Sequence, residues 1–127
     1  MKLYMCKYCG TIVEKSSSPS TSGCSAAGHS SHSWSKLTSD GSLSAVSGYK
    51  AYGCRYCGKI IYSKSTPSTS GCSAAGHSSH SWSSLCSKTS SSAKTYQCKY
   101  CGGTVQCEST PSTSGCPAHS SHSWSRL

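Results

Sequence analysis

The chain has 127 residues, of which only 34% are hydrophobic, none is Phe and more than a quarter are Ser. Hydrophobic burial alone cannot stabilise such a chain, and no apolar run is long enough to cross a membrane, so composition excludes an ordinary globular core and a membrane span. The formal net charge of +9 suits an anionic partner such as nucleic acid, although scattered Lys on a Ser-rich surface also serves solubility.

The first of three repeated units spans residues 1–37. The run LYMC predicts a short strand, CKYCG at residues 6–10 a tight turn, and TIV at 11–13 a returning strand. The stretch PSTSGCSAAGHSSHSW follows at 19–34, and residues 31–37 are expected to form another strand. The unit is therefore predicted to be a hairpin tipped by a C-x-x-C-G turn and closed by a third strand.

The unit returns twice along the chain. Residues 38–48 have no periodicity and are expected to form a flexible linker. The second unit, 49–85, repeats the long stretch letter for letter, and a linker rich in Ser and Lys follows at 86–94. The third unit, 95–127, carries a shortened copy, PSTSGCPAHSSHSW.

The fold class follows from periodicity and unit size. No segment has helical periodicity over the roughly ten residues that a helix requires. Units this small bury little apolar surface, so each needs a metal, a disulfide or a partner for stability. We therefore expect a small metal-stabilised β fold, with three tandem β-ribbons of short hairpins and loops and little or no helix.

The cysteines predict metal sites. Most of the 11 Cys stand at matched positions, three per unit, and each trio is followed by histidines. A disulfide framework needs no His at a repeated offset, whereas a zinc site with three thiolates needs a fourth ligand, for which imidazole is usual. We therefore predict one zinc ion per unit and three per chain. The predicted thiolate ligands are Cys6, Cys9 and Cys24, then Cys54, Cys57 and Cys72, then Cys98, Cys101 and Cys116.

Two histidines compete for the fourth position in every unit. We favour the later one, because the motif H-S-W would place it on the final strand, two residues before a Trp on the same face. The earlier one is also stereochemically feasible, and the spare His is then expected at the surface. The favoured ligands are His32, His80 and His122, and the alternatives are His29, His77 and His119.

Two cysteines lie outside the repeat. Cys86 aligns with Thr38, and Cys107 aligns with Lys15 and Ser63. We interpret both cysteines as unpaired small side chains, with a redox-linked pair joining units 2 and 3 as the alternative.

The chain is not expected to be an enzyme. Three Cys and one His close a zinc site, whereas a catalytic zinc keeps a position open for water. The acidic residues Glu14, Asp40 and Glu108 do not recur at a matched position, and the H-x-E and P-C-x-x-C elements of a deaminase are absent. We therefore expect no small-molecule substrate.

Fourteen residues separate the second Cys from the third in every unit. With this gap, C-x-x-C-G, Gly-Cys and H-x-W in place, each unit resembles the zinc-ribbon and rubredoxin-knuckle class of small modules. The resemblance implies a structural zinc in a three-stranded β-ribbon, and such modules serve in transcription, RNA binding, ribosome contacts and protein docking. The ligand set of three Cys and one His departs from the commoner four-Cys ribbon. Small repeated proteins of this kind also resemble products of phage or mobile-element genomes.

Two kinds of partner remain open. The turns pair a cation with an aromatic ring, which suits contact with phosphates and bases of nucleic acid, with little sequence specificity because Asn, Gln and Arg are scarce. The alternative is a structural or adaptor protein that docks on a protein partner or forms a homo-oligomer. The candidate nucleic-acid contacts are Lys7, Tyr8, Arg55, Tyr56, Lys99 and Tyr100.

Location is inferred from the first residues and from the lack of a membrane span. The start, MKLYMCKYCG, has no apolar signal-peptide region, and no run is long enough to cross a membrane, so a reducing setting is the default. We expect an intracellular, cytoplasmic protein, or one of a host cell or virion if it derives from a phage.

Overall fold

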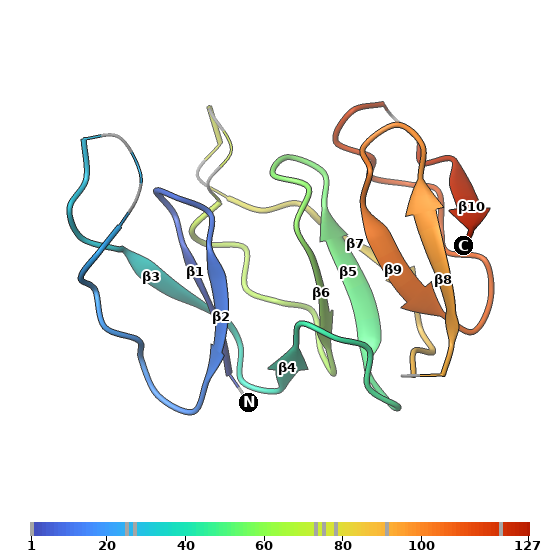
Figure 1. The fold of residues 1–127 in the computed structure, drawn as a ribbon, viewed down its shortest axis with the longest axis horizontal. Coiled ribbons are helices and arrows are strands. Elements are labelled where there is room, and N and C mark those ends of the chain that lie inside the picture. Colours follow the sequence, from blue (N-terminus) through green and yellow to red (C-terminus); the bar gives the residue numbers. More distant parts are fainter. Residues whose placement is uncertain are drawn as a thin grey trace.

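Each repeated unit forms its own small antiparallel sheet, and the three sheets stand side by side along the long axis of the molecule (Figure 1). The structure, a computed structural model, describes residues 2–24, 26, 28–72, 74, 76–77, 79–90, 92–119 and 121–127. Within these ranges all regular structure is strand, which confirms the expected β fold without helix. The described part contains no helix that could cross a membrane.

The three sheets share one topology, in which the first strand of the unit lies between the other two. In unit 2 a short extra strand is added at the edge, giving the order β4-β6-β5-β7. The strands are β1 (Lys2–Cys6), β2 (Ile12–Lys15) and β3 (Trp34–Thr38), then β4 (Gly41–Ser42), β5 (Lys50–Cys54), β6 (Ile60–Ser63) and β7 (Trp82–Cys86), then β8 (Lys94–Cys98), β9 (Thr104–Cys107) and β10 (Trp124–Arg126).

The turn that joins the first two strands of each unit requires glycine. In unit 1 the N–H of Gly10 donates to the carbonyl of Cys6 at 2.9 Å, with a φ of 76° at Gly10. A side chain at this left-handed φ would be strained, which explains the Gly after the second Cys. Gly58 and Gly102 repeat the conformation, with φ of 76° and 74°.

Neighbouring units pack through small apolar clusters rather than one central core. Between units 1 and 2, Leu37 of β3 packs with Ile61 of β6. Between units 2 and 3, Leu85 of β7 packs with Val105 of β9. Because each unit is thin, its strands are buried partly by the next unit, and the three modules form one stack.

The segment between units 1 and 2 is held in place, where the sequence suggested a flexible linker. Its strand β4 pairs with β6, and Ala45 is buried in the cluster between units 2 and 3. Thr89, in the second linker, donates through its hydroxyl to the carbonyls of Val46 and Tyr49 at 2.9 and 3.0 Å. The two linkers therefore brace each other against the sheets.

The interpretation of Cys86 and Cys107 as unpaired is wrong, and the alternative of a pair joining units 2 and 3 is confirmed. They form a disulfide that joins β7 of unit 2 to β9 of unit 3, with their Cα atoms 6.2 Å apart. The equivalent residues at the other interface, Thr38 and Ser63, hydrogen-bond through their buried hydroxyl groups at 2.8 Å. The same structural position thus carries a hydrogen bond at one interface and a covalent link at the next.

Candidate metal centres and basic tips

In each unit the structure brings together the three repeated cysteines and the later histidine. Every ligand atom of a cluster lies within 4.8 Å of the others. The Sγ atoms of Cys6 and Cys24 are 3.9 Å apart, and the equivalent atoms in unit 3 are 4.0 Å apart. The imidazole Nδ1 lies 3.5 to 3.6 Å from the Sγ of the second cysteine in all three units.

These separations fit the edges of a zinc tetrahedron. Zinc lies about 2.3 Å from sulfur and about 2.0 Å from imidazole nitrogen, so tetrahedral geometry places two sulfurs about 3.8 Å apart and sulfur about 3.5 Å from nitrogen. Both the sulfur–sulfur and sulfur–nitrogen distances agree with these values within a few tenths of an ångström. The four groups of each cluster could therefore hold a tetrahedral metal ion with little rearrangement.

Backbone N–H groups around the turn favour the thiolate form of its first cysteine. Burial raises the pKa of the Cys6 thiol, but the backbone N–H groups of Cys9, Ser33 and Tyr8 lower it by more. The pKa is therefore about 7, below the ordinary value of 9.0. The N–H of Ser33 lies 3.4 Å from the Cys6 sulfur. Donors aimed at sulfur are what a bound thiolate requires, because they offset its negative charge.

The second thiol of the turn behaves in the opposite way in unit 3. Burial and the negative charges of Cys98 and Cys116 raise the pKa of Cys101 to about 11. The pKa of Cys98 itself is lowered to about 6. Its burial raises this pKa, but hydrogen bonds from backbone N–H groups and from the imidazole of His122 lower it by more. Three thiolates this close repel one another, so full ionisation requires a cation among them.

A tryptophan fixes the ring of each candidate ligand histidine. In unit 2 the rings of His80 and Trp82 stack with centroids 4.5 Å apart, and the Trp82 indole N–H donates to the carbonyl of Ser68 at 2.9 Å. Units 1 and 3 repeat both contacts. The tryptophan thereby ties the Ser-rich loop to the candidate ligand histidine. The outer nitrogen of His80, Nε2, is buried and has no hydrogen-bond partner among the described residues.

The earlier histidine of each pair lies outside the cluster. His29 stacks on Tyr8 with ring centroids 3.6 Å apart, and His77 stacks on Tyr56 at the same distance. In unit 3 His119 meets Tyr100 at 4.0 Å with a tilt of 44°. The geometry therefore favours the later histidine as the fourth ligand, and gives the spare one a role in the turn that the sequence did not reveal.

This division of roles can be tested with two variants of unit 2. We expect His80→Ala to lower the zinc content from three ions to two, because it removes a ligand. The matched change His77→Ala should leave three ions, because its ring stacks on Tyr56 instead. Metal analysis of the purified proteins measures both. Loss of zinc from the His77 variant alone would reverse the assignment.

The three turns line up along one edge of the molecule. The turns between β1 and β2, β5 and β6, and β8 and β9 all lie at the upper edge in Figure 1. Each carries a cation over an exposed tyrosine: the Lys7 Nζ lies 5.4 Å from the Tyr8 ring, and the Lys99 Nζ lies 5.2 Å from the Tyr100 ring. In unit 2 the guanidinium of Arg55 takes this place at 6.0 Å from Tyr56. We call these three turns, with their stacked histidines, the basic tips.

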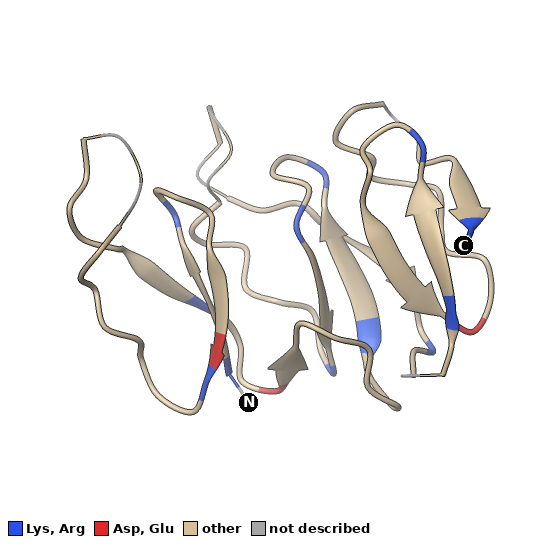
Figure 2. Cartoon of the chain, in the orientation of Figure 1, with Lys and Arg blue, Asp and Glu red and all other residues tan. Residues whose placement is uncertain are grey.

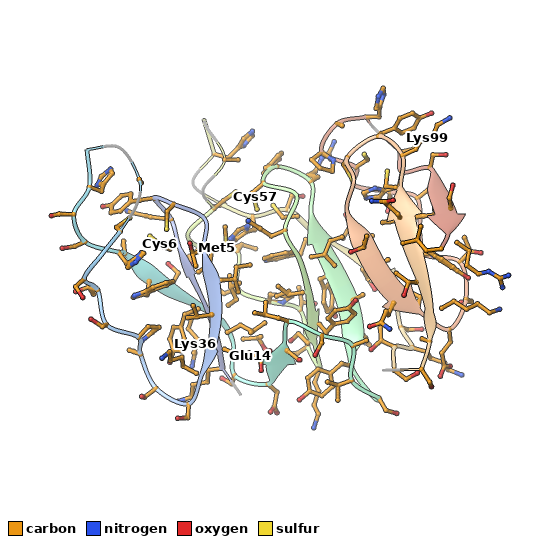
Figure 3. All side chains as sticks on the ribbon, viewed as in Figure 1. Met5, Cys6, Glu14, Lys36, Cys57 and Lys99 are labelled. Carbon is orange, nitrogen blue, oxygen red and sulfur yellow. A yellow bond between two sulfur atoms is a disulfide. The ribbon has the colours of Figure 1, made fainter. Side chains whose placement is uncertain are left out.

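The carboxylates lie away from the tip edge. Figure 2 shows Lys or Arg at all three tips, whereas every Asp and Glu lies in the lower half of the same view. Figure 3 places the labelled Lys99 at the upper edge and Glu14 far from it. The glutamate instead accepts from the N–H of Leu43 at 2.7 Å, which ties it to the linker. The tip edge therefore carries its cations without a carboxylate nearby, although further Lys lie in the lower half of the view.

Two shallow grooves lie between neighbouring tips. One of about 430 Å³ runs from Lys7 and Tyr8 of unit 1 to His77 of unit 2. The other, of about 350 Å³, runs from Arg55 of unit 2 to His119 of unit 3. The histidine of one tip thus faces the cation of the tip before it, so tips and grooves alternate along the edge.

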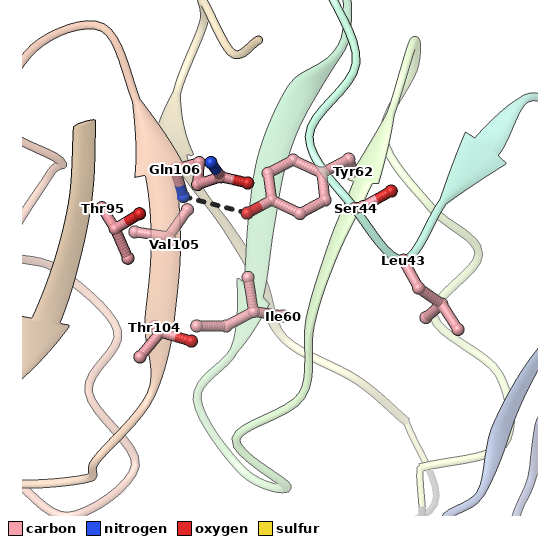
Figure 4. A pocket seen from close by; sticks show the side chains of 8 residues that line it. All are labelled: Leu43, Ser44, Ile60, Tyr62, Thr95, Thr104, Val105 and Gln106. Carbon is pink, nitrogen blue, oxygen red and sulfur yellow. Dashed lines mark hydrogen bonds between the residues drawn. The ribbon is translucent and has the colours of Figure 1, made fainter. Parts of the chain in front are cut away.

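Another hollow lies away from the tips and carries no candidate chemistry. It measures about 520 Å³ and lies between β6 and β9, where the Tyr62 hydroxyl accepts from the N–H of Gln106 at 2.9 Å (Figure 4). Apart from Tyr62, its described lining offers aliphatic, hydroxyl and amide groups only. Burial raises the pKa of Tyr62, so this phenol stays neutral and serves packing.

Comparisons of the chain with protein-family models, curated proteins and solved structures found no match in any of the three. Function therefore has to be argued from the clusters and the tips themselves.

Proposed function

We propose that the protein is a non-enzymatic array of three zinc ribbons that binds nucleic acid through its basic tips with little sequence specificity. The metal half of the proposal is carried by three clusters, each of three thiols and one imidazole at the spacing of a zinc tetrahedron. All four ligands of each cluster belong to the protein, so zinc here would supply fold stability and hold the tips in shape.

The nucleic-acid half is supported by the tip edge. Each tip offers a cation that can contact a phosphate and an exposed Tyr beside a His, on which a base can stack. The two rings are stacked in units 1 and 2 and tilted in unit 3. Zinc lowers the charge at each site by one, because it adds two positive charges and three thiolates, so the formal +9 becomes about +6. The loaded protein remains basic, and its tip edge remains free of carboxylates.

Binding is expected to depend on the charge of the nucleic-acid backbone and on the stacking of its bases. On single strands, each neutralised phosphate contributes about −0.7 to the slope of log affinity against log salt concentration. Three tip cations should therefore give a slope of about −2. A flexible single strand can follow a row of separate tips, whereas a rigid duplex presents its bases to one another. Single-stranded RNA or DNA is therefore the favoured ligand.

We expect the triple variant Lys7→Glu, Arg55→Glu and Lys99→Glu to weaken binding of a fluorescent single-stranded oligonucleotide by more than about tenfold, because it reverses every tip cation. Fluorescence anisotropy at several salt concentrations measures both the loss and the slope. The fold should persist, because all three side chains are exposed.

The chain supplies a matched control with the same total charge. Lys2, Lys50 and Lys94 occupy equivalent positions at the far ends of β1, β5 and β8, about 16 Å from the tips along the strands. Changing these three residues to Glu should reduce the affinity for the oligonucleotide much less than the triple change at the tips does. Equal losses in both triple variants would mean that net charge, and not the tip edge, drives binding. No binding by the unmodified protein at low salt would refute the nucleic-acid proposal.

A further inference from the structure

The two interfaces inside the molecule are copies of one another. The N–H of Ser68 donates to the carbonyl of Leu37 at 2.6 Å, and the N–H of Ser112 donates to that of Leu85 at 2.7 Å. In both cases the Ser-rich loop of one unit docks on the third strand of the unit before it. The chain therefore uses the same contact, between equivalent residues, twice in succession.

Close approach at these interfaces depends on glycine. A Cβ added at Gly71 would lie 2.5 Å from the Oγ of Ser35, and one at Gly115 would lie 2.5 Å from the Oγ of Ser83. The equivalent pair for a next interface is Gly23 of unit 1 and Ser125 of unit 3. A Cβ at Gly23 would meet no described atom within 4 Å, so the space that a neighbouring unit fills at Gly71 and Gly115 is empty here.

The apolar residues that would form the next such contact are at least partly exposed at the two ends of the stack. Leu37 and Leu85 are each 2% exposed in their interfaces, whereas the equivalent Leu127 is 72% exposed. On the opposite side of the contact Ile61 is fully buried, but its counterpart in unit 1, Val13, is only half-buried.

The loop proline follows the same pattern. Pro67 and Pro111 are buried, and their counterpart Pro19 is half-buried. End units of a stacked array normally cover such surfaces with polar residues, because an uncapped face attracts further copies. The end faces of this stack are only partly polar. Lys15 of unit 1 stands where Ser63 and Cys107 are buried, and Gln97 of unit 3 stands where Met5 is buried, but Leu127 stays exposed.

We propose that the protein associates head to tail with a second copy of itself, with unit 3 of one chain docking on unit 1 of the next. The tail face is Ser125 and Leu127, and the head face is Val13, Pro19 and Gly23. In the complex Leu127 packs on Val13 of the second copy, and an oxygen of Leu127 accepts from the N–H of its Ser20.

The contact is heterologous, because its two faces differ, so each added chain leaves one face of each kind open. Association therefore continues beyond the dimer unless the rotation per chain closes a ring. The row of basic tips would continue from one chain into the next. The inference does not rest on nucleic-acid binding, because only the packing of units carries it.

Sedimentation velocity of the full zinc-loaded chain tests the proposal. Over a dilution series, the weight-average mass is expected to rise reversibly above 13.2 kDa as concentration increases. Leu127→Asp should abolish the rise, because it places a charge at the centre of the tail face. The control Leu43→Asp makes the same change at a residue that is 45% exposed and outside both faces, and should leave the rise intact.

A mixing experiment distinguishes head-to-tail contact from any other association. Leu127→Asp blocks the tail face, and Pro19→Glu, on a loop, blocks the head face. Each variant alone is expected to stay at 13.2 kDa, whereas an equal mixture should form a species of twice that mass and nothing larger. Ser125→Tyr is a second tail variant, because its ring would occupy the space that Gly23 leaves.

Three results would overturn the proposal. The unmodified chain could remain at the mass of one chain at every concentration. The tail variants could associate as strongly as the unmodified chain does. The mixture of head-blocked and tail-blocked variants could fail to form the paired species.

Discussion

Removal of metal is expected to unfold all three units of the protein. Structural zinc contributes on the order of 10 kcal/mol per site in small modules at neutral pH, which exceeds what the small clusters between these units can supply. Chelation should therefore abolish the β-sheet circular dichroism, and metal analysis should find three zinc ions per chain beforehand. Trp fluorescence reports on the sites directly, because each of the 3 Trp stacks on the candidate ligand histidine of its own unit.

Variants of single sites refine this prediction. Cys57→Ser and Cys101→Ser should each lower the zinc content by one ion. Loss of zinc from unit 2 should destabilise the fold more than loss from unit 3. Unit 2 packs on both neighbours, whereas unit 3 packs on one within the chain. Chelator already saturated with zinc is the control for effects of the chelator itself. A protein that keeps its sheet signal without metal would contradict the model of metal-dependent folding.

The sequence predicted the parts of the structure that depend on local spacing. The C-x-x-C-G turns, the three-stranded units and the grouping of Cys and His all follow from short motifs whose geometry is set by a few backbone angles and by the ligand number of zinc. The later histidine was favoured because it stands two residues before a Trp on one strand face. The structure shows that same pair stacked, for example His32 on Trp34.

The sequence could not predict how the units pack on one another. The contacts between Leu37 and Ile61, or between Gly71 and Ser35, join residues of different units, and periodicity within a unit says nothing about them. A signal did exist in the alignment of repeats, because Cys86 and Cys107 replace a Thr and a Ser at the ends of equivalent strands. Only knowledge that these positions meet across an interface would have favoured the disulfide over two unpaired cysteines.

Reduction of the Cys86–Cys107 disulfide is expected to lower the stability of the zinc-loaded protein by about 3 kcal/mol, since the bridge closes a loop with a sequence separation of 21. The measurement is a denaturant titration of the zinc-loaded protein with and without a phosphine reductant. Mass spectrometry after alkylation would confirm that two thiols have been released. The double variant Cys86→Ala and Cys107→Ala should show the same loss without reductant.

The other interface of the molecule supplies the matched control for the disulfide. The double variant Cys86→Thr and Cys107→Ser installs at the second interface the pair that Thr38 and Ser63 form at the first. Because that pair is hydrogen-bonded and buried, it should recover about 1 kcal/mol relative to the double Ala variant. Recovery of this size would show that the two interfaces are interchangeable in energy as well as in shape. An unchanged denaturation midpoint on reduction would mean that the packing of units 2 and 3, and not the covalent link, holds this interface together.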